Sequence, residues 1–250
     1  MKSNTGRSRL DVVLVERGLA ESRQKAQAMI LAGEVRVDGA RAEKAGIPVS
    51  SDARIDVNSR LQKYVGRGGF KLEGALGDFS VDPIGLVCLD VGSSTGGFTD
   101  CLLQHGATRV YAVDVNTAQL DWKLQEDSRV VRIERNARGL KPDDVPEMAG
   151  LVVVDVSFIS VTKLLGAVIA CAQQGAIFLI LVKPQFELRR EDVGPGGIVQ
   201  DTRLHEKAIA SVHKAAEIAG LTSLDVRASH LLGAEGNQEY FLHARKEALE

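Results

Sequence analysis

Residues 89–106 read LDVGSSTGGFTDCLLQHG, in which an apolar strand is followed by a glycine-rich turn and then by a helix. The turn beginning at Gly92 has the spacing of a nucleotide-triphosphate loop, except that Phe98 stands where the phosphate-binding lysine is required. Asp90, two residues before the first glycine, adds negative charge that disfavours a phosphate. The stretch therefore predicts a strand–turn–helix unit whose ligand carries no phosphates.

The same rhythm of strand and helix continues from residue 86 to the end of the chain. Apolar runs predict five strands, at 86–91, 109–115, 129–133, 150–156 and 176–182. Helices of about 10 to 15 residues are expected between them. A helix over 202–219 and two further strands near 221–229 and 237–245 complete the pattern. It predicts an α/β, Rossmann-like doubly wound fold with a mostly parallel sheet, covered on both faces and ending in an antiparallel edge hairpin.

Polar residues at the ends of these strands indicate which ligand the loop holds. Asp114 ends the second strand, 22 residues after Gly92, where a carboxylate can accept both hydroxyls of a ribose, and Asn136 is placed to read an adenine edge. The glycine spacing G-x-x-x-G-G differs from the dinucleotide fingerprint and suits S-adenosylmethionine, which has no phosphate. The predicted cofactor site comprises Asp90, Gly92, Ser93, Thr95, Gly96, Phe98, Asp114 and Asn136. The alternative is that the small residues only permit a tight turn.

Charge is distributed unevenly along the 250 residues, although the formal net charge is only −2. Residues 1–73 carry 14 Lys and Arg against 9 Asp and Glu, a net charge of +5, and the remaining residues carry −7. A basic first part joined to an acidic second part indicates two domains, the first of which binds a polyanion.

Composition also excludes several classes of protein. The three cysteines are scattered and the five histidines lack metal-ligand spacing, which predicts neither disulfides nor a metal site. The start, MKSNTGRSRL, has no apolar core of a signal peptide, and no apolar run approaches the roughly 20 residues that span a bilayer. A cytoplasmic protein is therefore expected.

The basic first part has the pattern of two helices followed by a hairpin. Helical spacing begins at Leu10 and is expected to stop at Gly18, and Ser22 is the expected N-cap of a helix over 23–32. Alternating residues on either side of Asp38-Gly39 predict a tight hairpin.

The stretch SRLDVVLVERGLAESRQKAQAMILAGEVRVDG resembles the small RNA-binding domain named after the fourth protein of the small ribosomal subunit. The resemblance implies that basic side chains contact the phosphates of structured RNA. The matching positions are Arg9, Arg23, Lys25 and Arg36. The alternative is that these are solvated surface charges. We expect this domain over residues 1–60, a linker over 61–67 and the larger domain over 68–250.

Four charged residues stand at the ends of predicted elements in the larger domain. They are Lys71 in GGFKL, Asp155 in VVVDVSF, Lys183 in ILVKPQFE and Glu239 in GNQEYF. Asp155 and Lys183 each end an apolar run, so they should be partly desolvated and in need of partners. Each residue alone could be an ordinary surface charge. Their order and spacing match the Lys-Asp-Lys-Glu tetrad of the FtsJ-like ribose 2′-O-methyltransferases.

Together with the N-terminal domain, these motifs resemble the TlyA family of ribosomal RNA methyltransferases, also called hemolysin A. The resemblance covers residues 8–246 and includes GRGGFKL, DVGSSTGGFTD, DVSFIS, LVKPQFE and GNQEYF. It implies S-adenosylmethionine-dependent 2′-O-methylation of a cytidine in ribosomal RNA, within an assembled ribosomal subunit. No membrane and no protein partner are predicted.

Two roles are open for Lys183 in such a reaction. As a neutral amine it would accept the proton of the ribose hydroxyl, which requires burial or the nearby Lys71 to remove its charge. As an ammonium it would stabilise the developing alkoxide. Asp155 would orient Lys183, and Lys71 and Glu239 would position the ribose. Phe98 and Phe158 could line the cleft or pack in the core.

Three other functions are compatible with parts of the sequence. A pore-forming cytolysin, as the older family name suggests, lacks any amphipathic membrane hairpin here. A non-catalytic RNA-binding assembly factor with a vestigial cofactor fold is disfavoured by the complete tetrad. A methyltransferase for bases or small molecules is disfavoured because DVSF (155–158) replaces the N-P-P-Y or D-P-P-Y type of motif.

Overall fold

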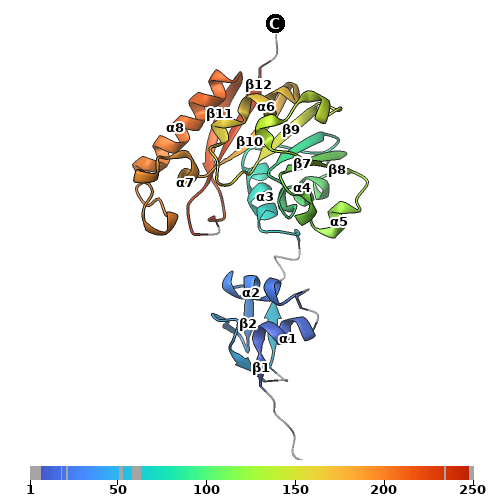
Figure 1. The fold of residues 1–250 in the computed structure, drawn as a ribbon, viewed down its shortest axis with the longest axis vertical. Helices are drawn as coiled ribbons and strands as arrows, with labels where there is room; N and C mark the ends of the chain where they lie inside the picture. The colour runs from blue at the N-terminus through green and yellow to red at the C-terminus, as the bar shows by residue number, and fades with distance from the viewer. Residues whose placement is uncertain are drawn as a thin grey trace, which may run out of the picture. The chain divides into compact units, whose positions relative to one another are not determined.

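The computed structural model describes residues 7–17, 19–20, 22–50, 53–57, 63–233 and 235–247. The chain forms two compact units, Met1–Lys63 and Tyr64–Glu250. The first contains short helices and strands, and the second is built around one large sheet (Figure 1). Tyr64, at the start of the second unit, is buried and packs edge-on against Phe70.

The first unit is a small α+β fold around an apolar core. Its elements are β1 (Ser8–Arg9), α1 (Leu10–Glu16), α2 (Arg23–Leu31), β2 (Val35–Val37), β3 (Ala40–Arg41), β4 (Pro48–Val49) and β5 (Ile55–Val57). Leu10 and Leu14 of α1 pack with Ile30 of α2 and Val35 of β2, all at most 1% exposed. The apolar spacing seen in the sequence therefore forms the contact between the two helices and the β3-β2-β5 sheet.

The turn and cap signals of this unit are confirmed. Ser22 caps α2, because its Oγ accepts a hydrogen bond from the amide of Lys25 at 3.2 Å. Asp38 and Gly39 both have positive φ, 50° and 83°, as a two-residue hairpin turn between β2 and β3 requires. Gly18, the expected end of the first helix, lies outside the described residues.

The second unit contains a seven-stranded sheet in the order β11-β12-β10-β9-β6-β7-β8. The strands are β6 (Val87–Val91), β7 (Arg109–Asp114), β8 (Val130–Glu134), β9 (Ala149–Val154), β10 (Ala172–Val182), β11 (Leu221–Ala228) and β12 (Tyr240–Lys246). The pairings among β6 to β10 are parallel, and β12 is antiparallel to both of its neighbours. The predicted fold class is confirmed, but the antiparallel strand β12 lies inside the sheet and β11 forms the edge.

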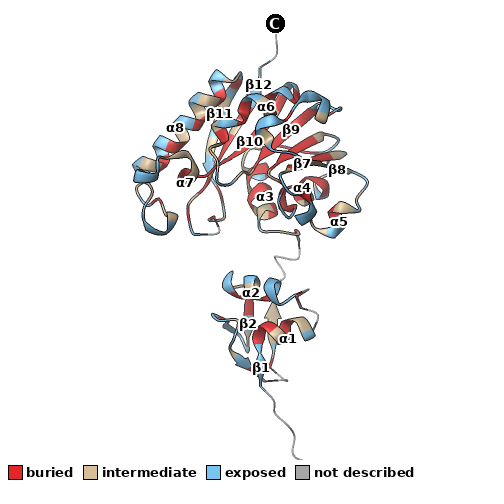
Figure 2. Cartoon of the chain, in the orientation of Figure 1, coloured by how far each residue is buried: buried red, intermediate tan, exposed pale blue. Residues whose placement is uncertain are grey.

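Helices cover both faces of this sheet. They are α3 (Gly68–Asp78), α4 (Gly97–Gln104), α5 (Trp122–Gln125), α6 (Leu165–Ala170), α7 (Pro184–Glu187) and α8 (Thr202–Ile218). Alternate strand residues pack with α6 and α8 on one face and with α3 and α4 on the other. Every residue of β9 is buried, which explains its uninterrupted apolar sequence (Figure 2).

The prediction of connecting helices of about 10 to 15 residues is wrong for part of the chain. Only the four-residue α5 and a 3₁₀ turn separate β7 from β8. Between β8 and β9 the described residues contain two 3₁₀ turns, Ala137–Gly139 and Pro142–Asp144, and no α-helix. Gly139, Pro142 and Pro146 explain the difference, since proline lacks an amide donor and glycine disfavours helix interiors.

Candidate active site

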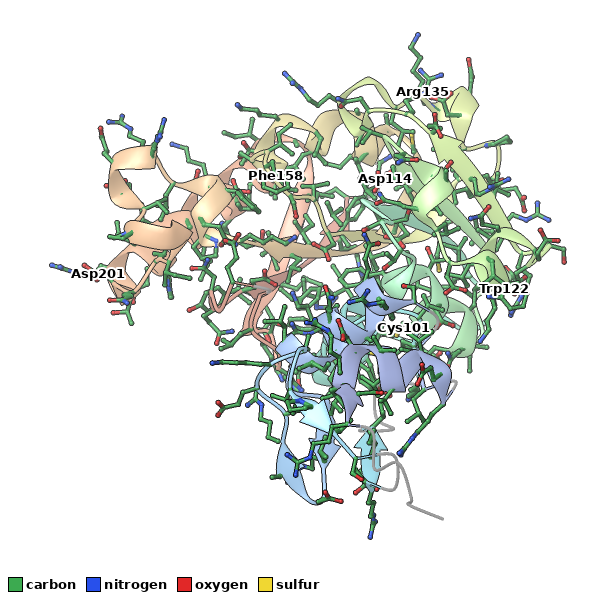
Figure 3. All side chains as sticks on the ribbon, turned by 60° about the horizontal axis from the view of Figure 1, so that its bottom comes forward. Cys101, Asp114, Trp122, Arg135, Phe158 and Asp201 are labelled. Carbon is green, nitrogen blue, oxygen red and sulfur yellow. The ribbon has the colours of Figure 1, made fainter. Side chains whose placement is uncertain are left out.

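A cavity of about 520 Å³ opens at the carboxyl ends of the parallel strands. It lies where the strand order reverses, because β6 is flanked by β7 on one side and by β9 on the other. This is the position at which doubly wound sheets bind ligands. Its lining includes Gly92, Asp114, Asn136, Asp155 and Phe158. Three of the lining residues, Asp114, Arg135 and Phe158, are labelled in Figure 3.

Gly92 brings the loop after β6 against the end of β9. Its φ is +89°, and a Cβ built on it would lie 2.2 Å from the carbonyl oxygen of Asp155. The amides of Gly92 and Ser93 both donate to the carbonyl of Val113, at 2.8 and 3.1 Å. Only glycine fits this crossing of backbones, which joins the cavity to the strand end that carries Asp155.

Asp114 is held in place by amides of two loops, those after β6 and β7. Its Oδ2 accepts from the amide of Ser94 at 2.9 Å, and its Oδ1 accepts from the amide of Asn116 at 3.1 Å. The carboxylate therefore faces the cavity in a fixed orientation. Asn136 also lines the cavity, with its Oδ1 accepting from the amide of Arg138 at 3.1 Å. The two side chains expected to read ribose and adenine thus lie on one wall.

Two residues of the predicted cofactor site pack in the interior instead. Phe98, in the first turn of α4, is 3% exposed and stacks on Phe241 with 6.1 Å between ring centroids. Gly96 has φ +97°, and a Cβ there would lie 2.2 Å from Leu124. Neither residue lines the cavity, because Phe98 fills the core and Gly96 allows α5 to pack closely, and a contact of either with the cofactor stays a prediction.

Two further predicted residues, Thr95 and Ser93, do not line the cavity. Thr95 is exposed, and its carbonyl accepts from the amide of Asp121 at 3.1 Å. Ser93 is buried, and its Oγ has no hydrogen-bond partner among the described residues. Both therefore shape the turn.

Asp90 lies beneath the loop, fully buried on β6. Its Oδ2 accepts from the hydroxyl of Thr99 at 2.6 Å, and its Oδ1 has no partner within the described part of the chain. Burial raises the pKa of this carboxyl to about 7, and the hydrogen bond from Thr99 limits the increase. Asp90 therefore anchors the first turn of α4 through Thr99, and its contact with the cofactor stays a prediction.

Asp155 and Lys183 form an ion pair at the ends of β9 and β10. Nζ of Lys183 lies 2.5 Å from Oδ1 of Asp155 and donates to Oγ of Ser157 at 2.9 Å. Their side chains are 21% and 10% exposed, so the pair is largely shielded from water. Asp155 also lines the cavity, so its ion pair with Lys183 lies beside the space proposed for a cofactor.

Lys71 and Glu239 form a second, more deeply buried ion pair. Nζ of Lys71, on α3, lies 2.5 Å from Oε2 of Glu239, and their side chains are 10% and 3% exposed. Tyr240 pairs with Val182 in the β10–β12 ladder, so Glu239 and Lys183 are the next two residues in the same register. The backbone therefore brings all four predicted catalytic residues to one edge of the sheet.

Sequence reasoning missed Ser157 and Glu187, which fix the loop after β9. Ser157 binds Lys183, and the carboxylate of Glu187 accepts from Oγ of Ser160 at 2.5 Å and from the amide of Val161 at 2.9 Å. Burial raises the pKa of Glu187. Between these contacts Phe158 has φ +65° and is 92% exposed at the rim of the cavity. The motif DVSFIS marks this loop in the sequence, but the spacing of apolar residues does not predict which side chains a loop contacts.

The predicted RNA-binding residues lie in the first unit. Arg9 and Arg23 both form ion pairs with Asp11, at 3.0 and 3.2 Å. Lys25 is exposed on α2, and Nη1 of Arg36 donates to the carbonyl of Gly39 in the hairpin turn at 3.1 Å.

The described residues contain neither a metal-ligand cluster nor a helix that could cross a membrane. Among the described residues, no three His, Cys, Asp or Glu side chains are arranged to hold a metal ion. Within the same residues, no helix has the length and apolar character needed to cross a membrane.

Comparison with known proteins assigns each of the two units to a protein family. The model of the FtsJ-like methyltransferase family matches residues 64–246, and the S4 domain matches residues 8–55. The chain is 47% identical over 241 residues to the 16S/23S rRNA (cytidine-2′-O)-methyltransferase TlyA of Mycobacterium tuberculosis, covering 96% of this chain and 90% of that protein. It is 41% identical to hemolysin A of Brachyspira hyodysenteriae, covering 94% and 98%.

Solved structures agree with this assignment. A protein of Streptococcus thermophilus, provisionally described as a hemolysin, superimposes with a TM-score of 0.77 at 38% identity, over 97% of this chain and 90% of that chain. A methyltransferase structure from Listeria monocytogenes, at 14% identity and a TM-score of 0.55, covers 73% of this chain and all of that chain. The second likeness shows the methyltransferase fold alone. The chain therefore belongs to the TlyA (hemolysin A) family, in which an S4 domain precedes an FtsJ-like methyltransferase domain.

Proposed function

We propose that this protein transfers a methyl group from S-adenosylmethionine to the ribose 2′-oxygen of a cytidine in ribosomal RNA, within an assembled subunit in the cytoplasm. The observation that carries the proposal is the register of β12 on β10, which puts Glu239, the partner of Lys71, opposite Lys183, the partner of the cavity-lining Asp155. The TlyA relative of Mycobacterium tuberculosis is named as a 16S/23S rRNA (cytidine-2′-O)-methyltransferase.

The cavity fits the proposed cofactor. Its volume of about 520 Å³ is within the range of small-molecule sites. The carboxylate of Asp114 is placed to accept ribose hydroxyls, and Asn136 and Gly92 complete the proposed contacts. The carboxylate of Asp114, which lines the cavity, suits a cation and disfavours phosphates. When bound, S-adenosylmethionine supplies an activated methyl group on a positively charged sulfur.

The contacts of Lys183 favour one of its two possible roles. A carboxylate at 2.5 Å and a hydroxyl at 2.9 Å both stabilise the ammonium form, which has three donors. One donor is engaged by Ser157 and the ammonium pairs ionically with Asp155, which leaves donor capacity for the ribose hydroxyl. We assign Lys183 to stabilising negative charge on the 2′-oxygen as its proton passes to solvent water.

Lys71 and Glu239 then position the ribose. Their pair is more deeply buried than that of Lys183, and breaking such a pair leaves an uncompensated charge in the interior. A fixed arrangement of this kind lowers the barrier mainly by orientation, because the reacting oxygen must lie in line with the methyl group. The S4 domain supplies affinity for the RNA through phosphate contacts.

The experiment that tests the proposal uses purified 30S and 50S subunits from a strain that lacks the enzyme. With S-adenosylmethionine labelled in its methyl group, we expect the wild-type protein to label the RNA of at least one subunit. The Lys183→Ala variant should bind the cofactor but transfer label at an initial rate at least about 100-fold lower. Equal labelling by the variant, or no labelling of either subunit by the wild-type protein, contradicts the proposal.

A further inference from the structure

Asp11 is a buried carboxylate that contacts two of the proposed RNA-binding residues, Arg9 and Arg23. It lies in the first turn of α1, 0% exposed, and it accepts four hydrogen bonds. Arg9 donates from Nε to Oδ1 and from Nη2 to Oδ2, both at 3.0 Å. Nη2 of Arg23 and Nε2 of Gln27 also donate to Oδ2, at 3.2 and 2.8 Å. A carboxylate has about four lone-pair sites, so these four hydrogen bonds occupy its full accepting capacity.

The two arginines come from different parts of the unit but converge on this one group. Arg9 ends β1 and Arg23 begins α2, and both guanidinium groups bind the same oxygen of Asp11. Their side chains are nevertheless 53% and 57% exposed. The carboxylate thus holds the inner edges of both groups, while their remaining N–H donors face solvent. The hydrogen bonds from Arg9 and Gln27 hold the pKa of Asp11 well below its usual range.

We propose that Asp11 is a positioning residue that presents Arg9 and Arg23 as a paired site for a phosphodiester of the RNA. The inference rests on the proposed function, since RNA binding by this unit is itself proposed. A free arginine side chain loses about 2 kcal/mol of rotamer entropy when a ligand fixes it. Fixing both groups before the RNA arrives removes that cost from binding.

When the charge of Asp11 is removed, the proposal predicts the opposite change in RNA affinity from the one expected from charge alone. A carboxylate repels the phosphates of RNA, so removing its charge should strengthen binding if electrostatics dominated. Positioning predicts the opposite, because an amide at residue 11 offers only one acceptor oxygen to the two guanidinium groups. The sign of the change in affinity therefore separates the two accounts.

The test compares Asp11→Asn with Asp56→Asn in the full-length protein. Asp56 is a matched control, because it pairs with Arg54 in the same unit but is 45% exposed. Dissociation constants are measured with in vitro transcribed 16S and 23S rRNA across a salt series. We expect Asp11→Asn to weaken binding at least tenfold and to reduce the salt slope by about one or two phosphate contacts. Asp56→Asn should bind as well as the wild-type protein or more tightly.

Kinetics distinguish positioning from a loss of fold. Asp11→Asn should raise KM for the RNA and leave kcat unchanged, because the reaction takes place in the other unit. If Asp11→Asn does not fold, Arg9→Lys tests the same idea, since lysine keeps the charge but cannot bind both carboxylate oxygens. We expect Arg9→Lys to bind at least fivefold more weakly and Lys44→Arg, at an exposed position of the same unit, to bind normally.

Two arginine variants separate failure of this inference from failure of the proposed RNA-binding role. Normal binding by Arg9→Ala and Arg23→Ala contradicts an RNA-binding role for these residues, and the inference with it. Weak binding by both, with normal or tighter binding by Asp11→Asn, contradicts only the positioning by Asp11. Weak binding by all three, with a normal Asp56→Asn control, supports the inference.

Discussion

Nζ of Lys183 lies 2.5 Å from Oδ1 of Asp155, across the ends of two adjacent parallel strands. Neither side chain could be partly buried at this edge without the other, because an unpaired buried ion is costly. The pair also has an open side, since Asp155 lines the cavity. A charged pair that is shielded from bulk water but open to a ligand cavity is suited to stabilising charge in a reaction.

Replacing Lys183 by Ala should lower kcat by about 100- to 1000-fold, the usual cost of losing a donor to a developing oxyanion. Cofactor affinity should change less than about threefold, because Lys183 does not line the cavity. Single-turnover methyl transfer and calorimetric titration measure the two quantities. Lys214→Ala, on the exposed face of α8, is the control and should retain full activity. A variant of Lys183 with normal kcat contradicts its assigned role.

Replacing Asp114 by Asn should weaken S-adenosylmethionine binding about 10- to 100-fold, because hydrogen bonds to a charged group contribute about 1.5–3 kcal/mol. The amide oxygen can still accept from Ser94, so the loop should survive. Asp121→Asn is the matched control, since Asp121 caps α5 but does not line the cavity. Equal cofactor affinity in the two variants, measured by calorimetry, would exclude Asp114 from the ribose site.

Replacing Gly92 by Ala should both destabilise the protein and impair catalysis. The positive φ alone costs about 1–3 kcal/mol for a residue with a Cβ. A Cβ would also press on the carbonyl oxygen of Asp155 at 2.2 Å, so the ion pair with Lys183 should shift. Gly139→Ala is the comparison, because nothing lies within 4 Å of a Cβ there. If the two variants have similar unfolding curves and similar rates of methyl transfer, the backbone crossing at Gly92 has room for a Cβ and the prediction is wrong.

Asp90 should make the stability of the protein depend on pH. Burial raises its folded-state pKa to about 7, compared with about 3.9 in the unfolded chain. Between these values the folded state binds more protons, so this carboxyl lowers the unfolding free energy as pH rises from about 4 to 7.

The Asp90→Asn variant keeps an acceptor for Thr99 but loses the titration. Its stability relative to the wild-type protein should therefore increase over that pH range, by up to about 4 kcal/mol, and then level off. Urea unfolding at several pH values measures the difference. A difference that is independent of pH contradicts the raised pKa.

The strand ends could be predicted from the sequence, and the contacts between elements could not. Asp114, Asp155 and Lys183 were identifiable because each follows a short apolar run, and parallel strands share one carboxyl edge. The pairing of Lys71 with Glu239 needed the register of β12 on β10, which depends on a strand inserted from far along the chain.

Other features depended on packing in three dimensions. Phe98 and Gly96 stand in the middle of the loop motif, yet α4 and α5 turn them towards the interior. The sequence marks such residues as small or apolar but does not say which side of the turn they face. Asp11 was likewise one of many acidic residues in the sequence, and only the fold shows two arginines converging on it.

The two ion pairs, Asp155–Lys183 and Lys71–Glu239, are expected to direct methyl transfer to a ribose oxygen. The most direct measurement is to modify ribosomal subunits with labelled S-adenosylmethionine, digest the RNA to nucleosides and identify the labelled product by mass spectrometry. We predict a single product, cytidine methylated on its 2′-oxygen, which is absent with Lys183→Ala. A label on a base, or a labelled ribose that persists in the Lys183→Ala and Glu239→Gln variants, contradicts the account.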